Sequence, residues 1–124
     1  MAPVRPKSAS VRTPATRTKA GYAKTLAAQP VGSGAELVSV EADLTRGLHA
    51  FSIVGLADKA VEEARDRVSA AVRHSGYKPP KQQNKRIVLS LAPADLKKEG
   101  SHYDLALALA YLIAIGEVPP LQEE

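Results

Sequence analysis

The chain has 124 residues, of which 44% are hydrophobic and 24% are charged, as expected for one globular domain with a single core. It contains no cysteine, which excludes disulfide bonds and thiolate metal sites and agrees with a cytoplasmic location. The longest apolar run, from Leu105 to Ile115, is shorter than the ~20 residues that cross a bilayer, so no membrane partner is expected.

Basic residues are concentrated at the amino terminus. The formal net charge is +4, but six of the 17 basic residues and none of the 13 acidic residues lie within residues 1–24. Three prolines and several serines and threonines predict that residues 1–20 form a disordered basic arm. A solvated extension is the simpler interpretation, and contact with nucleic-acid phosphates is the alternative. The basic residues that would make this contact are Arg5, Lys7, Arg12, Arg17 and Lys19.

Two strands are predicted at the start of the domain. Residues 22–28 are expected to form a short strand, and the Pro and Gly residues of 29–34 predict a turn or loop that could close a hairpin. Residues 36–44 alternate between apolar and polar side chains, which is typical of a half-buried strand. Three aliphatic residues of this strand should face the core: Val38, Val40 and Ala42.

A third strand and a helix follow. Residues 48–55 should form a strand antiparallel to the preceding one, after a tight connection at 45–47. Asp58 can cap a helix that Gly76 would end in the left-handed conformation. The buried side of this helix should consist of Val61, Ala64, Val68, Ala71 and Val72. The stretch 78–86 is then expected to be a polar loop outside the core.

The last two elements complete the pattern. Residues 85–92 predict a strand with Ile87, Leu89 and Leu91 on its covered face. The apolar segment that begins at Asp104 predicts a central helix. The order of strands, helix, strand and helix favours an α+β fold in which a mixed sheet packs with helices.

Motifs for nucleotide or metal chemistry are missing from the sequence. A P-loop requires GxxxxGK followed by Ser or Thr, and no such run occurs, so no nucleotide cofactor is assigned to this chain. His49, His74 and His102 lack metal-ligand spacing, so no metal site is expected.

Ser101 lies close to Lys97 and Lys98, which leaves a Ser–Lys hydrolase as an alternative. Adjacent side chains rarely meet, so a turn before the buried helix explains this segment better, and no catalytic residue is assigned.

A second basic group lies around the end of the first predicted helix and in the segment that follows. Its members are Arg65, Arg67, Arg73, Lys78, Lys81, Lys85 and Arg86, of which Lys81, Lys85 and Arg86 are the candidates for nucleic-acid contact. Acidic neighbours dilute this charge, and simple solvation of the surface is the alternative.

Two long strings of the sequence resemble the amino-terminal domain of the ComM/YifB family. They are RGLHAFSIVGLADKAVEEARDRVSAAVRHSGY at 46–77 and RIVLSLAPADLKKEGSHYDLALALAYL at 86–112. Ala57 and Ala106 stand where the family usually has Pro, so two turns depart from the family pattern. The resemblance implies a fold like the Lon proteolytic domain and the second domain of a small-subunit ribosomal protein.

The resemblance also implies a domain organisation and a function. Residues 21–118 would be the family domain, and residues 119–124 a tail or linker. In the family this domain precedes a AAA+ ATPase module, and the whole proteins are similar to the magnesium-chelatase ATPase subunit and resemble hexameric, ring-forming motors. The competence members of the family are implicated in branch migration of DNA. This chain would then be a fragment, a split gene product or a stand-alone domain.

The expected role is that of a non-catalytic module whose partners are a AAA+ ATPase, DNA and further copies of itself. ATP and Mg²⁺ would bind only the ATPase module. Loops beside rigid elements are the interface candidates: Arg46, Gly47, Gly55, Asp58, Lys97, Lys98, Glu99 and Gly100. A Lon-like Ser hydrolase and a degenerate scaffold remain the alternatives, although alignment with Lon places the nucleophile near His102 and not at Ser101.

Overall fold

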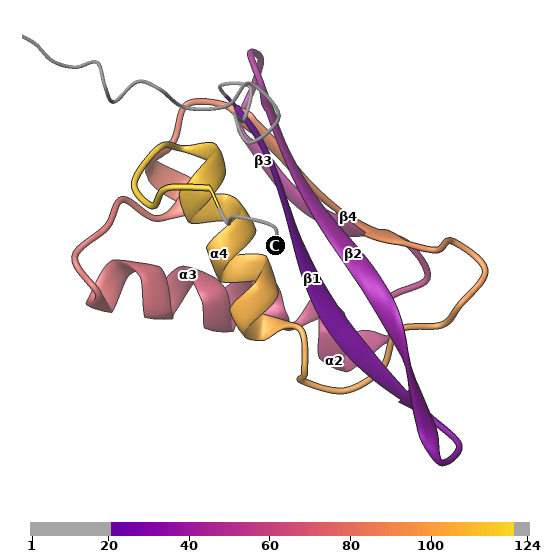
Figure 1. Ribbon diagram of the computed structural model, residues 1–124. Coiled ribbons are helices and arrows are strands. Elements are labelled where there is room, and N and C mark those ends of the chain that lie inside the picture. Colours follow the sequence, from indigo (N-terminus) through magenta and orange to yellow (C-terminus); the bar gives the residue numbers. More distant parts are fainter. Residues whose placement is uncertain (1–20, 121–124) are drawn as a thin grey trace, which may run out of the picture.

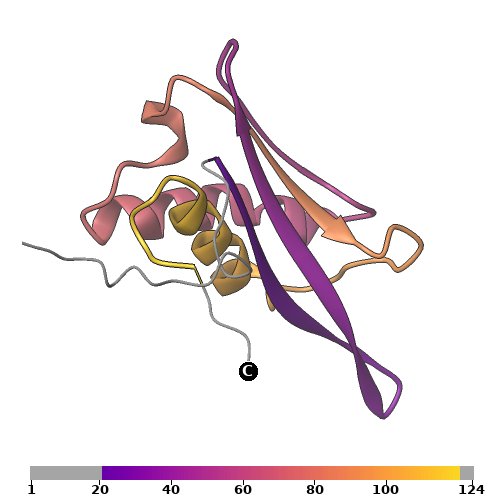
Figure 2. The same cartoon turned by 45° about the horizontal axis from the view of Figure 1, so that its top comes forward.

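A computed structural model of the chain describes residues 21–120. The predicted basic arm, 1–20, and the last four residues of the predicted tail lie outside this range. One sheet is covered on one face by helices, and its other face is open (Figures 1 and 2). The elements in chain order are β1 (Tyr22–Val31), β2 (Gly34–Thr45), β3 (Ala50–Val54), α2 (Lys59–Glu62), α3 (Ala64–His74), η2 (Pro80–Gln82), β4 (Arg86–Ala92) and α4 (Asp104–Ala114).

The four strands form a mixed sheet in the order β1-β2-β4-β3. β2 is antiparallel to β1 and to β4, whereas β3 is parallel to β4. The predicted α+β class, a mixed sheet packed with helices, is therefore confirmed. β2 and β3 do run in opposite directions, but β4 lies between them, so the tight connection predicted at 45–47 is wrong. The helical crossover places β4 parallel to β3. Because β4 also pairs with β2, the connection from β2 to β3 must span the width of β4.

The β1–β2 hairpin is longer than predicted. The stretch assigned to a loop at 29–34 belongs mostly to the strands: β1 continues to Val31, β2 begins at Gly34 opposite it, and only Gly32 and Ser33 separate them. Gly32 has φ +58°, which suits a two-residue hairpin turn. Pro30 is tolerated inside β1 because this strand is at the edge of the sheet.

The first predicted helix is divided at Glu63 into α2 and α3. Asp58 caps α2 as predicted, since its carboxylate accepts a hydrogen bond from the backbone N–H of Val61 at 2.8 Å. Gly76 follows α3 with φ +91°, as predicted for the left-handed C-cap. Ala71 is exposed, contrary to prediction, because it lies about 100° around the helix from the buried Val72.

The core lies between the sheet and the helices α3 and α4. The predicted inward residues of β2 and β4 are all buried: Val38, Val40, Ala42, Ile87, Leu89 and Leu91. α4 supplies the central layer, with its Leu107 and Tyr111 fully buried, as expected for a helix apolar on nearly all sides. None of the helices between residues 21 and 120 combines the length and the hydrophobicity needed to cross a membrane.

The stretch predicted as a polar loop, 78–86, is partly buried. Pro79 and Pro80 are buried, and the short helix η2 begins at Pro80. The Tyr111 hydroxyl donates a hydrogen bond to the carbonyl oxygen of Lys78 at 2.6 Å and accepts one from the Gln83 side-chain amide at 3.1 Å. The prediction of a wholly polar loop was wrong because it was based on the many charged and amide side chains of this stretch. The Pro79–Pro80 pair among them is apolar and packs on the domain.

Candidate functional site

The directions of the strands place the predicted interface residues at two ends of the sheet. β3 and β4 are parallel, so the loops that follow them meet at one end and bring Gly55 and Asp58 close to residues 97–100. Arg46 and Gly47 lie at the opposite end, where Thr45 pairs with the first residue of β4. The eight candidates therefore do not form one surface.

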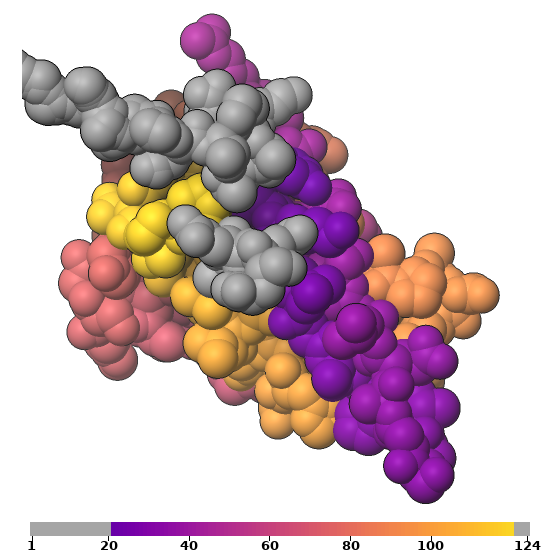
Figure 3. Space-filling view, in the orientation of Figure 1, coloured from indigo at the N-terminus to yellow at the C-terminus, as the bar shows by residue number. Residues whose placement is uncertain are grey.

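We call residues 55–58 and 93–103 the loop cluster. Its two segments are joined through the backbone, because the Asp58 N–H donates to the Lys98 carbonyl at 3.0 Å and the Lys98 N–H donates to the Leu56 carbonyl at 2.9 Å. The segment after β4 projects as a separate lobe on the side away from the helices, close to the β1–β2 hairpin (Figures 1 and 3). These backbone hydrogen bonds between the two segments thus hold the lobe in place.

The Lys98 side chain is the internal support of the loop cluster. It is fully buried, and its ammonium group donates to the carbonyl oxygen of Pro93. Burial lowers the pKa of Lys98, and the nearby Asp95 carboxylate partly opposes this shift. Ser101 is exposed, and no hydrogen bond joins it to Lys98 or to the exposed Lys97.

Gln29 fastens the loop cluster to β1. Its side-chain oxygen accepts hydrogen bonds from the Glu99 N–H at 3.0 Å and from the Tyr103 hydroxyl. Tyr103 is fully buried; burial raises its pKa, and the carboxylates of Asp58 and Glu99 add to the shift. Sequence reasoning missed both Gln29 and Tyr103, because no local pattern indicates a contact across more than 70 residues.

Gly55 and Leu56 have unusual backbone conformations. Gly55 has φ +117°, and a Cβ atom there would lie 2.2 Å from the Leu91 carbonyl oxygen. Leu56 has φ +55°, a conformation that leucine rarely adopts, and 56% of its surface is exposed. The loop cluster therefore holds an apolar side chain outwards at a cost in local strain.

The other end of the sheet is basic. We call Arg46, Lys81, Lys85 and Arg86 the basic end; all four are exposed. The β2–β3 connection is joined to the start of β4 by a hydrogen bond of 3.2 Å between His49 Nδ1 and the Lys85 carbonyl. Within residues 21–120 the one ion pair is Arg67–Asp104 at 2.6 Å, so the basic end has no carboxylate within 4.0 Å in that range. Arg5, Lys7, Arg12, Arg17 and Lys19 lie outside the described residues.

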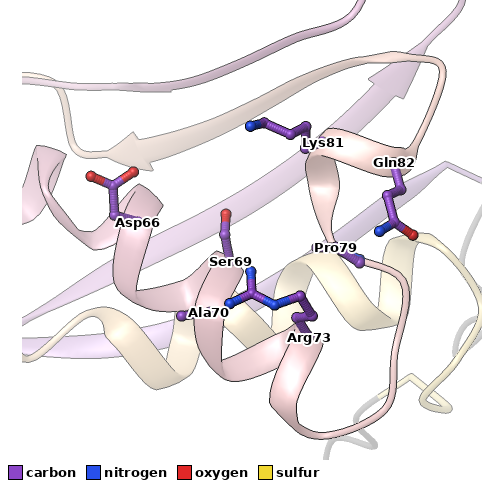
Figure 4. Close-up of a pocket in the computed structure, with 7 residues that line it drawn as sticks. All are labelled: Asp66, Ser69, Ala70, Arg73, Pro79, Lys81 and Gln82. Atoms are coloured by element: carbon purple, nitrogen blue, oxygen red, sulfur yellow. The ribbon is translucent and has the colours of Figure 1, made fainter.

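A cavity of about 300 Å³ lies between α3 and η2 (Figure 4). Its lining residues are Asp66, Ser69, Ala70, Arg73, Pro79, Lys81 and Gln82. The sequence placed Arg73 and Lys81 in one basic group but did not predict the cavity, since the buried Pro79 that forms part of its wall was assigned to a loop. In the part of the chain that the structure describes, no group of three or more His, Asp or Glu residues could hold a metal ion.

Comparison with known proteins identifies related sequences. Residues 40–124 match the family model described as subunit ChlI of Mg-chelatase. YifB of Escherichia coli K12 is 46% identical over 84 residues, which cover 68% of this chain and 16% of that protein. The competence protein ComM of Haemophilus influenzae is 45% identical over 84 residues, which again cover 68% of this chain and 16% of that protein. The uncharacterized protein Rv2897c of Mycobacterium tuberculosis is 48% identical over 88 residues, which cover 71% of this chain and 17% of that protein. The chain thus spans about one sixth of the length of these relatives.

Proposed function

Because the chain belongs to the ComM/YifB family of magnesium-chelatase-like proteins, we propose that it is a non-catalytic module that docks on a AAA+ ATPase. Together with further copies of itself, it would support assembly of the ATPase ring. It would also support DNA processing, such as branch migration in competence. The proposed fold relationship is to the Lon proteolytic domain, and the proposed unit is residues 21–118 with a tail from residue 119.

ATP and Mg²⁺ are assigned to the ATPase partner. The sequence has no P-loop in which backbone N–H groups could surround the phosphates of ATP. Its own residues would instead bind and orient a partner, which requires a fixed surface and no reacting group.

The observation that carries the docking proposal is the exposure of Leu56 on a rigid loop cluster. A buried lysine, a glutamine from β1 and two backbone hydrogen bonds all fix the position of this cluster. An interface core is usually apolar and preorganised, because ordering a loop on binding would reduce affinity. Leu56 meets both conditions.

Leu56→Asp tests this proposal. Affinity of the 124-residue chain for the purified AAA+ module of a ComM/YifB relative should fall by on the order of tenfold or more, because a charge replaces a leucine that the partner would bury. Leu48→Asp is the matched control, since Leu48 is 91% exposed at the opposite end of the sheet and should leave the affinity unchanged. Calorimetric titration measures both. Equal affinity of the Leu56→Asp variant and the unmodified chain would show that the loop cluster is not the docking surface.

The DNA part of the proposal is supported by the uncompensated charge of the basic end. Lysine and arginine that contact phosphates release counterions, so affinity for DNA should fall as salt is raised. Replacing Lys85 and Arg86 by Gln should reduce the salt dependence together with the affinity. Labelling of the chain by a serine-reactive phosphonate, lost in Ser101→Ala, would contradict its non-catalytic character.

A further inference from the structure

One side of α3 carries polar residues that the core does not use. Asp66, Ser69 and Arg73 recur at intervals of three and four residues, so they form a row along one side of the helix. At 1.5 Å per residue, the two ends of this row are about 10 Å apart. Asp66 and Arg73 therefore stand at the two ends of the row, but the Arg73 side chain reaches back along the helix, so that its guanidinium lies close to Ser69 and Ala70 (Figure 4).

The wall opposite this row is held rigidly. Backbone hydrogen bonds of 3.0 Å form the short helix η2, from Gln82 to Pro79 and from Gln83 to Pro80. The buried Tyr111 hydroxyl bonds to residues on both sides of η2, Lys78 and Gln83. Lys81, which extends from η2 over the cavity, thus stands on a fixed support (Figure 4).

The cavity has excess positive charge. Arg73 and Lys81 have no carboxylate oxygen within 4.0 Å among residues 21–120, although Asp66 lines the same cavity. The carboxyl end of α3 adds about half a negative charge, which is less than either full cation. The two cations together therefore outweigh Asp66 and the helix end by about half a charge, and the cavity attracts an anion.

We infer that this cavity binds a phosphate group, with Arg73 and Lys81 as counter-charges and the Ser69 hydroxyl and Gln82 amide as hydrogen-bond donors. The planar guanidinium matches two phosphate oxygens, and the ammonium adds a point charge. A volume of about 300 Å³ is at the lower limit of ligand pockets, which suits one compact group. The site itself stands on the geometry of α3 and η2; only the idea that the phosphate belongs to DNA rests on the proposed function.

The test is a titration of the ¹⁵N-labelled 124-residue chain with inorganic phosphate, at constant ionic strength against chloride. The backbone amide signals of Ser69, Arg73 and Gln82 should shift and saturate. Arg73→Gln should weaken phosphate binding by on the order of tenfold, because a charged hydrogen-bond donor is lost. Arg65→Gln is the matched control: Arg65 is exposed on the same helix but does not line the cavity. Unsaturable shifts spread over all basic residues, or equal effects of the two variants, would overturn the site.

A second titration with a short single-stranded oligonucleotide identifies the source of the phosphate. Shifts of the same amides, reduced by Arg73→Gln, support a nucleic-acid phosphate in the cavity. Saturable binding of inorganic phosphate without any oligonucleotide binding supports the site and refutes the proposed DNA role. Oligonucleotide shifts confined to Lys85 and Arg86, with no phosphate response in the cavity, refute the site and leave the DNA role intact.

Discussion

The loop cluster and the basic end are both fastened by a buried tyrosine near an end of α4, yet they present opposite chemistry. Tyr103, beside the start of α4, bonds to Gln29 and holds a cluster that exposes Leu56. Tyr111, in the second half of α4, bonds to residues around η2 and holds a segment that carries Lys81. One central helix thus fixes a loop cluster with an exposed leucine at one end of the sheet and a cationic surface at the other. The two surfaces can act independently because no hydrogen bond joins them within the described residues.

Gly55→Ala should have the largest effect and should disrupt the loop cluster alone. The new Cβ would collide with the backbone of Leu91 at 2.2 Å in a left-handed conformation, so we expect a loss of about 3 kcal/mol or more in the free energy of unfolding. Gly76→Ala is the matched control, since Gly76 has φ +91° with nothing within 4 Å, and it should cost only about 1 kcal/mol. Urea unfolding measures both. Similar losses in the two variants would show that crowding at Leu91 is unimportant.

Removing each tyrosine hydroxyl compares the two ends directly. Tyr111→Phe leaves the Lys78 carbonyl and the Gln83 amide without this partner and should cost about 1–2 kcal/mol. Tyr103→Phe should cost about 1 kcal/mol or less, because Gln29 still accepts from the Glu99 N–H.

Amide hydrogen exchange locates these effects. Tyr111→Phe should speed exchange at Gln82 and Gln83, and Tyr103→Phe at Lys98 and Glu99. If either variant speeds exchange at both ends, the ends are coupled through α4 and the comparison fails.

The smallest effect is confined to alkaline pH. The pKa of Lys98 is lowered from 10.5, so between the lowered value and 10.5 the unfolded chain binds the proton that the folded chain releases. The free energy of unfolding should therefore rise with pH in this window, by at most about 1.4 kcal/mol per pH unit. Lys98→Met should remove this rise.

Three tyrosines titrate near the same window. The pKa values of Tyr22, Tyr103 and Tyr111 are raised from 10.0, so above pH 10.0 they reduce stability as pH rises. They do so in both proteins, and the difference between wild type and Lys98→Met isolates the lysine. An unchanged difference from pH 7 to 10.5 would mean that burial does not lower the pKa of Lys98.

The sequence predicted which side of each strand faces the core, but not which strands are neighbours. Alternation in 36–44 and 85–92 identifies the buried faces, and either neighbour of β2 satisfies the same alternation. Asp58 and Gly76 marked helix ends because caps are local interactions. β4 between β2 and β3 is a consequence of the crossover, which no local pattern contains.

The candidate site was predictable only where it depended on contiguous residues. Their position in loops beside rigid elements indicated Gly55, Asp58 and residues 97–100, and the structure brings these together. Gln29 was hidden by the Pro and Gly residues around it, which favour a turn. Leu56 was ordinary in sequence, because its exposure and positive φ arise from the backbone bonds to Lys98. The cavity required knowing that Pro79 and Pro80 are buried.

The position of β4 has a consequence for synthesis of the domain. A nascent chain that has not yet released residues 86–92 holds a hairpin and β3 with no backbone hydrogen bonds between them. Each would present an open strand edge to other chains in the crowded cell. The late arrival of one seven-residue strand closes both edges at once, so sheet completion is a single event near the end of translation of this domain.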